Sequence, residues 1–157
     1  SISASYDGTK LYVLGYNPAG TDILITQYDI DPDGSVADAI YDGALTVTDD
    51  GVPRYPDAGG TAFIIGMNAM HWKQDGTRLF VPRWHQKIIS GVTRATQPHI
   101  LEYRLTSPWD ITSATFHQYQ PVRSGSNGAT GFTFHPEGLR FWMSGLFEIT
   151  EYSLEET

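Results

Sequence analysis

The chain reads Tyr6-Asp7-Gly8-Thr9-Lys10-Leu11-Tyr12-Val13 near its start. Similar stretches recur as Gln74-Asp75-Gly76-Thr77-Arg78-Leu79-Phe80-Val81 and as Pro136-Glu137-Gly138-Leu139-Arg140-Phe141-Trp142-Met143. Asp-Gly is a strong signal for a tight turn between two strands, because Gly adopts the positive φ that such turns demand. The apolar run after each turn is typical of a strand that is buried on both faces. These stretches predict three copies of one β-rich repeat.

A second anchor follows each turn and has the pattern polar, Tyr, variable, aliphatic. It occurs as Gln27-Tyr28-Asp29-Ile30, Glu102-Tyr103-Arg104-Leu105 and Glu151-Tyr152-Ser153-Leu154. The Tyr and the aliphatic residue are two positions apart, so they share one face of a strand. The first two copies also align without a gap from Ile30–Tyr41 to Leu105–Phe116, which pairs Val36 with Ile111. Ordered anchors of this kind indicate a tandem repeat.

Each copy is expected to form up to four antiparallel strands. The first strand of each copy is predicted at Ile2–Ser5, Ala69–Lys73 and Gly131–His135, and the second at Leu11–Tyr16, Leu79–Trp84 and Leu139–Ser144. The third strand is predicted at Ile23–Ile30, Ile100–Leu105 and Ile149–Leu154. The fourth is predicted in the first two copies only, at Ile40–Val47 and Thr115–Val122. Tandem four-stranded units are typical of β-propeller blades. We therefore predict an all-β fold of propeller-type blades, partial or open, with units at 1–62, 63–128 and 129–157, the last one incomplete.

Two connections are much longer in some copies than in others. The second copy carries His85–Pro98 between its second and third strands, which we interpret as a loop, and the Gly/Pro/Asp-rich stretch Asp49–Gly60 precedes that copy. In an up-and-down blade these two connections emerge at the same end, so we expect them to line one surface. Variable loops on one face of a repeat array are often its binding face.

These residues resemble a family of tandem-repeat β-propellers from phage tail fibres, tailspikes, related virion proteins and some bacterial surface proteins. The resemblance is carried by Asp75-Gly76-Thr77-Arg78, Glu102-Tyr103-Arg104-Leu105, Thr106-Ser107-Pro108-Trp109-Asp110-Ile111-Thr112-Ser113-Ala114-Thr115 and Gly131–Gly138. It covers most of the chain and implies a propeller of about seven blades used for adhesion or virion structure. The chain departs from the family in its long loops and in stopping after the third strand of the third copy.

Composition excludes several classes of function. The net charge of −8 repels phosphate backbones, so no nucleic-acid partner is expected. The chain has no cysteine, which removes disulfides, Cys-ligated zinc and thiol catalysis. No stretch approaches about 18 uncharged apolar residues, so no membrane insertion is expected.

Motifs for chemistry are weak. Asp31-Pro32-Asp33-Gly34 resembles the start of a calcium loop, but it lacks the later oxygen ligands, so we interpret it as a turn with calcium as the alternative. His71 and His135 both fall on predicted first strands, where a metal site in a central channel is an alternative to two ordinary polar side chains. No nucleophile elbow or phosphate loop is present. We predict no catalytic residue, no metal ligand and no cofactor.

Aromatic residues near loops are the remaining candidates for ligand contact. Trp84 is the strongest of them, because it lies between Arg83 and His85 at the start of the longest connection, although core packing is an equal alternative for it. We add Tyr16 and Tyr55, so the predicted ligand-binding set is Arg83, Trp84, His85, Tyr16 and Tyr55. Phe147 is a further loop-edge aromatic, and we expect Trp109 to act as a structural plug between blades.

The sequence therefore predicts a non-enzymatic structural or adhesion module of a virion, such as a tail fibre or spike, on a virion surface or in an extracellular setting. Its expected partners are further copies of itself, neighbouring virion proteins, or a glycan or protein of a host surface. The alternatives are a propeller lectin and a metal-dependent propeller hydrolase. Because three blades are too few to close a propeller, we expect further chain or symmetry-related copies to complete the assembly.

Overall fold

The computed structural model describes residues 1–18, 22–31, 33, 35–47, 61–66, 69–89, 92–122, 131–136, 140–144 and 149–153. Of residues 61–66, 84–89, 92–98 and 131 it describes the backbone alone. The fold is all-β, as predicted, and consists of three antiparallel sheets. Within the described residues, no helix is long and apolar enough to cross a membrane.

The first sheet has four strands in the order in which they follow along the chain. They are β1 (Ile2–Ala4), β2 (Lys10–Tyr16), β3 (Ile23–Asp29) and β4 (Ile40–Val47). A short 3₁₀-helix, η1 (Val36–Asp38), connects β3 to β4. This is the four-stranded antiparallel unit predicted from the Asp-Gly turn and the anchors that follow it.

The second sheet has five strands and is the longest of the three. Its main path runs through β7 (Arg78–Ile89), β8 (Val92–Leu105) and β9 (Ala114–Pro121), with the 3₁₀-helix η2 (Ile111–Ser113) before β9. Two strands pair with β7 on its other side: β6 (His71–Trp72) with the start of β7, and β5 (Thr61–Gly66) with its far half. The third sheet contains β10 (Gly131–Phe134), β11 (Arg140–Ser144) and β12 (Ile149–Ser153).

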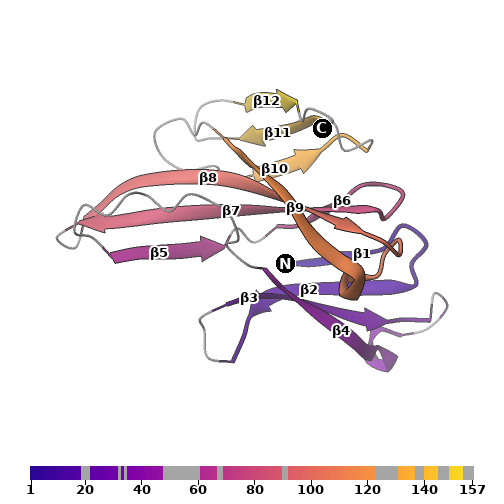
Figure 1. Ribbon diagram of the computed structural model, residues 1–157. Coiled ribbons are helices and arrows are strands. Elements are labelled where there is room, and N and C mark those ends of the chain that lie inside the picture. The colour runs from indigo at the N-terminus through magenta and orange to yellow at the C-terminus, as the bar shows by residue number, and fades with distance from the viewer. Residues whose placement is uncertain are drawn as a thin grey trace.

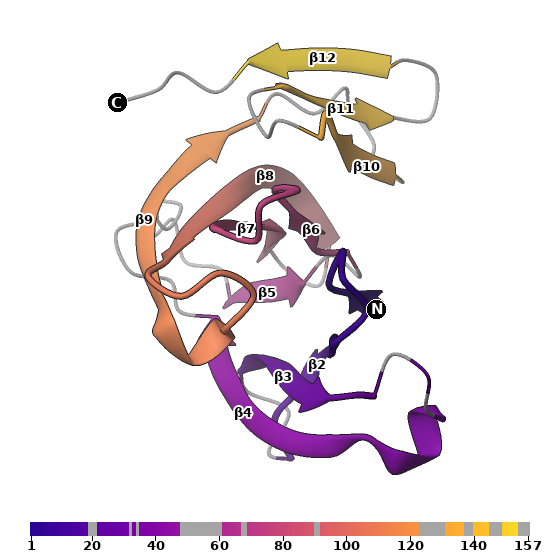
Figure 2. The same ribbon diagram turned by 90° about the vertical axis from the view of Figure 1, so that its right-hand side faces the viewer.

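The three sheets are stacked face to face in chain order, with the first at the bottom and the third at the top of Figures 1 and 2. Alternate side chains of the middle sheet serve the two interfaces, since neighbouring residues on a strand point to opposite faces. Leu79 and Val81 pack with Tyr12 and other residues of the first sheet, whereas Phe80 packs with Phe141 of the third. The middle sheet is thus buried on both faces, and the arrangement is compatible with neighbouring blades of a partial propeller.

The first two sheets repeat the same local geometry in detail. Gly8 and Gly76 have φ values of 74° and 71°, the left-handed conformation that favours Gly. Asp7 accepts hydrogen bonds from the backbone and hydroxyl of Thr9, and Asp75 makes the same pair of bonds with Thr77. The connections align equally well, because η1 and η2 occupy the positions that pair Val36 with Ile111 in the sequence.

The predicted strands are confirmed to within a few residues, but the prediction of a loop at His85–Pro98 is wrong. These residues extend β7 and β8 into a long hairpin, with register pairs that continue from Arg83 opposite His99 to Ile89 opposite Val92. Strand β5 was not predicted at all. The boundaries of the three repeat units stay predictions.

Candidate functional site

The predicted ligand-binding residues do not all lie together. Arg83, Trp84 and His85 are consecutive on β7, and the side chain of Arg83 is buried, with 4% of its surface exposed. Tyr16 ends β2 in the first sheet and is 54% exposed. The side chains of Trp84 and His85 and the whole of Tyr55 lie outside the described residues. Burial makes Arg83 a poor candidate for direct ligand contact, while Tyr16 is accessible.

The stretch Asp49–Gly60 lies outside the described residues, so the expectation that it lines one surface with His85–Pro98 stays a prediction. β5, which follows the Asp49–Gly60 stretch, pairs with β7 from Thr61 opposite Ile88 to Gly66 opposite Arg83. The result is a three-stranded extension of the second sheet, formed by β5 and the far halves of β7 and β8, which we call the arm. Figure 1 shows the arm reaching to the left beyond the other two sheets.

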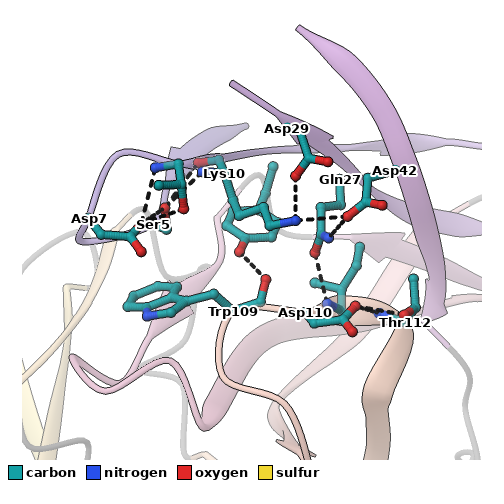
Figure 3. A network of polar contacts seen from close by, with 12 residues as sticks. Ser5, Asp7, Lys10, Gln27, Asp29, Asp42, Trp109, Asp110 and Thr112 are labelled. Atoms are coloured by element: carbon teal, nitrogen blue, oxygen red, sulfur yellow. Dashed lines mark hydrogen bonds and ion pairs between the residues drawn. The ribbon is translucent and has the colours of Figure 1, made fainter. Parts of the chain in front are cut away.

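The most extensive polar network that the structure describes lies between the first two sheets (Figure 3). At its centre Gln27 is fully buried, because β3 turns it to the same face as Ile23 and Ile25. Its Oε1 accepts a 2.8 Å hydrogen bond from the backbone N–H of Ile111 in η2, and its Nε2 donates to Asp42. One side chain thereby joins the first sheet to the connection before β9.

A charged group extends this network toward solvent. Lys10 Nζ forms ion pairs with Asp29 and Asp42. Partial burial acts to lower the pKa of Lys10, but the hydrogen bonds to the two carboxylates outweigh it and raise the pKa. Hydrogen bonds from Lys10 and Gln27 lower the pKa of Asp42. Lys10 and Asp42 thus favour each other's charged form, and the ion pairs are suited to holding β2, β3 and β4 together.

Trp109 is the structural plug that the sequence predicts. Its ring lies against Gly76, where an added Cβ would come within 2.5 Å of the indole, and it packs 5.3 Å from the ring of Trp72. Its carbonyl accepts a hydrogen bond from the hydroxyl of Tyr12 in the first sheet. Trp109 has a φ of 65°, which is rare for a bulky residue, so the contacts with its neighbours hold it in a strained conformation.

Glu102 occupies, in the second sheet, the position that Gln27 has in the first. It lies opposite Phe80 as Gln27 lies opposite Tyr12, and it is 2% exposed. Its carboxylate accepts a 2.7 Å hydrogen bond from Gln118 and forms ion pairs with Arg78 and Arg104. The buried carboxylate is thus held by groups of its own sheet, as such a charge requires.

The residues considered as metal ligands, Asp31 and His71, form hydrogen bonds with the backbone. Asp31 accepts a hydrogen bond from the backbone of Asp33, which is the bond of an Asx turn. The ring of His71 is within 3.0 Å of the carbonyl of Phe132, and burial lowers the pKa of this His against the effect of that hydrogen bond. Within the described part of the chain, no group of three or more His, Asp or Glu residues is placed to hold a metal ion.

Sequence reasoning missed the interface role of Gln27. The alignment marked its position as polar, but it assigned no partner to the side chain. A signal was present, since Gln27 shares its strand face with Ile23 and Ile25, and a polar residue on an apolar face needs a hydrogen-bond partner. The partner itself, Ile111, could not be read from spacing.

The comparisons with known proteins add no family to this picture. No protein-family model matches the sequence, and no curated protein matches it.

Proposed function

We propose that the chain is a non-enzymatic structural or adhesion module on a virion surface or in an extracellular setting, with the arm as its contact surface. The stacked sheets serve as a rigid support. The resemblance in the sequence supports the proposal. So does the structural role of the polar side chains between the first two sheets. Gln27, Lys10 and Tyr12 all join elements of the fold to one another.

The observation that carries the proposal is the arm itself. The paired strands β7 and β8 are longer than the equivalent pairs in the other two sheets, and β5 pairs with the far half of β7 on one side. A β-hairpin braced in this way is more rigid than a loop, and it presents backbone and side chains with a small entropic cost of binding. Trp84 lies at the root of the arm, where it pairs with Pro98.

The test measures binding of the fluorescently labelled chain to a panel of bacterial cells and to a glycan array. We expect binding that falls at least about tenfold, or about 1.4 kcal/mol, when residues 87–95 are replaced by Asn-Gly, which shortens the arm and leaves the register of Gln86 opposite Thr96 intact. Trp84→Ala reports on the root of the arm. Tyr6→Ala is the matched control, because Tyr6 is 77% exposed at a turn of the first sheet.

The outcomes separate the alternatives. Binding that a soluble glycan abolishes assigns the lectin function, whereas binding that only cell-surface protein supports assigns protein adhesion. If the shortened arm binds as well as the original chain, the arm is not the contact surface. A stoichiometric divalent ion in the purified protein would favour the hydrolase instead.

A further inference from the structure

Each sheet has two chemically different faces, which the two stacked interfaces define. We call the face that packs on the following sheet the leading face and the face that packs on the preceding sheet the trailing face. The leading face of the first sheet contains Tyr12 and Ile25, each 0% exposed, and that of the second contains Phe80 and Ile100 at 0% and 1%. The same residue types thus recur at each stacking surface.

Within the described residues, no other sheet covers the leading face of the third sheet. Its register places Trp142 opposite Glu151 and Ser144 opposite Ile149, as Tyr12 lies opposite Gln27 and Leu14 opposite Ile25 in the first sheet. Three residues of the third sheet therefore occupy positions equivalent to residues of the first sheet: Trp142 to Tyr12, Ile149 to Ile25, and Glu151 to Gln27. Ile149 is 75% exposed, whereas Ile25 is fully buried.

In the part of the chain that the structure describes, no other sheet covers the trailing face of the first sheet either. In the second sheet this face contains Leu79, Tyr103 and Ile111, which are 0%, 2% and 1% exposed. Their equivalents in the first sheet are Leu11, Tyr28 and Val36, and Val36 is 66% exposed.

The trailing face of the first sheet already has the shape of a stacking surface. Tyr28 and Tyr41 form an edge-to-face pair with ring centroids 6.1 Å apart, and Tyr103 and Phe116 form the same pair at 5.9 Å within the buried interface. Tyr41 is 63% exposed. An apolar surface of this kind, prearranged and open to solvent, is the mark of an interaction site.

The covered interface also shows how the two faces lock together. The helix η2 of the second sheet docks on the first sheet, with the N–H of Ile111 bonded to Gln27 and the side chain of Thr112 directly over Gly43. The helix η1 has the same form, with Ser35 capping it as Asp110 caps η2. On the uncovered leading face, the acceptor in place of Gln27 is the carboxylate of Glu151, which also accepts from Trp142 Nε1 at 2.8 Å.

We propose that copies of this chain associate head to tail, with the leading face of the third sheet of one copy stacked on the trailing face of the first sheet of another. The inference rests on the proposed function as a structural module. The occupant is a second copy because one chain carries both halves of the interface. In the complex, Trp142 and Ile149 cover the Tyr28–Tyr41 pair and Val36, and Glu151 accepts the hydrogen bond from η1. Such contacts are heterologous, so they build a ring or an open filament.

The test measures molar mass by light scattering and sedimentation over a concentration series of the whole chain. We expect the mass to rise at least about twofold above the 17.4 kDa of one chain. Val36→Lys places a charge on the trailing face of the first sheet, and Ile149→Lys places a charge on the leading face of the third sheet. Each charge should prevent stacking on its face. Both positions are exposed, so the fold should tolerate Lys, which circular dichroism and thermal unfolding check.

A mixing experiment distinguishes this arrangement from other forms of association. Each variant alone stays at the mass of one chain, but an equal mixture forms a complex of about twice that mass, because one intact face of each type remains. Tyr6→Lys is the control and should associate as the original chain does. The proposal is wrong if the original chain stays monomeric at every concentration. The two faces would then be exposed to solvent or bound by a different partner. The proposal is also wrong if Ile149→Lys associates with itself.

The double variant Val36→Lys/Ile149→Lys separates this inference from the proposed function. It is expected to be monomeric and still to bind cells or glycans through the arm. Loss of association with retained binding confirms that the stacking faces and the arm are independent. A chain that binds nothing but still associates head to tail contradicts the proposed function alone.

Discussion

Gln27 and Ile111 are 84 residues apart in the sequence, and the side chain of one accepts a hydrogen bond from the backbone N–H of the other at 2.8 Å. Both residues are buried, at 0% and 1% exposure. Ile111 begins a one-turn helix, and an N–H at this first position has no acceptor within the helix. Gln27 supplies that acceptor from the neighbouring sheet, so the bond fixes the position of the two sheets relative to each other.

Replacing this acceptor should destabilise the protein. Gln27→Leu keeps the volume roughly constant but leaves the N–H of Ile111 buried without an acceptor, so we expect a loss of about 1–3 kcal/mol in the free energy of unfolding. Urea denaturation measures it. Gln74→Leu is the matched control, because Gln74 is exposed and should change stability by less than about 0.5 kcal/mol. Equal stability of the two variants would contradict the role of Gln27.

The strands could be predicted from the sequence because their signals are local. The apolar runs after the Asp-Gly turns and the Tyr anchors placed β2 and β3 to within one residue at each end, and the fourth strand, β4, was placed at Ile40–Val47 without error. Turn geometry depends on a few neighbouring residues, which is why the ungapped alignment also paired Val36 with Ile111 correctly.

The arm and the network between the sheets were missed for different reasons. Residues 85–98 have no counterpart in the other copies, and comparison of the copies therefore treated them as a loop, although the β-branched residues Ile88, Ile89, Val92 and Thr93 are typical of strands. The network depends on which sheets stack. A hydrogen bond such as that between Gln27 and Ile111 follows from three-dimensional packing and has no spacing that a sequence could reveal.

Asp75 should make the protein sensitive to acid. Slight burial acts to raise the pKa of Asp75, but hydrogen bonds from Lys73 and Thr77 outweigh it and hold the pKa at about 2, below the ordinary 3.8. As the pH falls, the unfolded chain takes up this proton before the folded one does, so the stabilisation is present above pH 3.8 and is lost toward pH 2.

Asp75→Asn tests this pH dependence. It should lower the melting temperature at neutral pH, because the ion pair with Lys73 is lost, and it should flatten the fall in melting temperature between pH 4 and about pH 2. The side chain of Asp75 is 48% exposed, so the effect is reduced by solvent. Asp33→Asn, on an exposed turn, is the control. An unchanged slope in Asp75→Asn would contradict the prediction.

Tyr12 should contribute a hydrogen bond and a sensitivity to alkali. Burial raises the pKa of its phenol above the ordinary value of 10.0, so Tyr12 remains protonated and donates to the carbonyl of Trp109. Tyr12→Phe should cost about 0.5–1.5 kcal/mol at neutral pH. Above pH 10 the unfolded chain loses this proton first and stability falls, and the variant should lose less stability there. Denaturation at pH 7 and pH 11 compares the two chains.

The two turn glycines have the same backbone conformation but differ in the atoms that surround them. Gly8 and Gly76 share a positive φ, but a Cβ at Gly8 would meet nothing within 4 Å, whereas one at Gly76 would lie 2.5 Å from the ring of Trp109. Gly8→Ala should cost about 1–2 kcal/mol, which is the penalty for a side chain in the left-handed conformation. Gly76→Ala should lose about 1–3 kcal/mol more, because the indole must move.

A double-mutant cycle with Trp109→Leu isolates that contact. Removing the indole takes away the overlap but leaves the backbone strain, so Gly76→Ala in the Trp109→Leu background should cost only what Gly8→Ala costs in the original chain. Chemical denaturation of the four chains gives the coupling free energy, which we expect to be about 1–3 kcal/mol. A coupling near zero would mean that Trp109 is not held against the turn, and its role as the plug between the first two sheets would then be wrong.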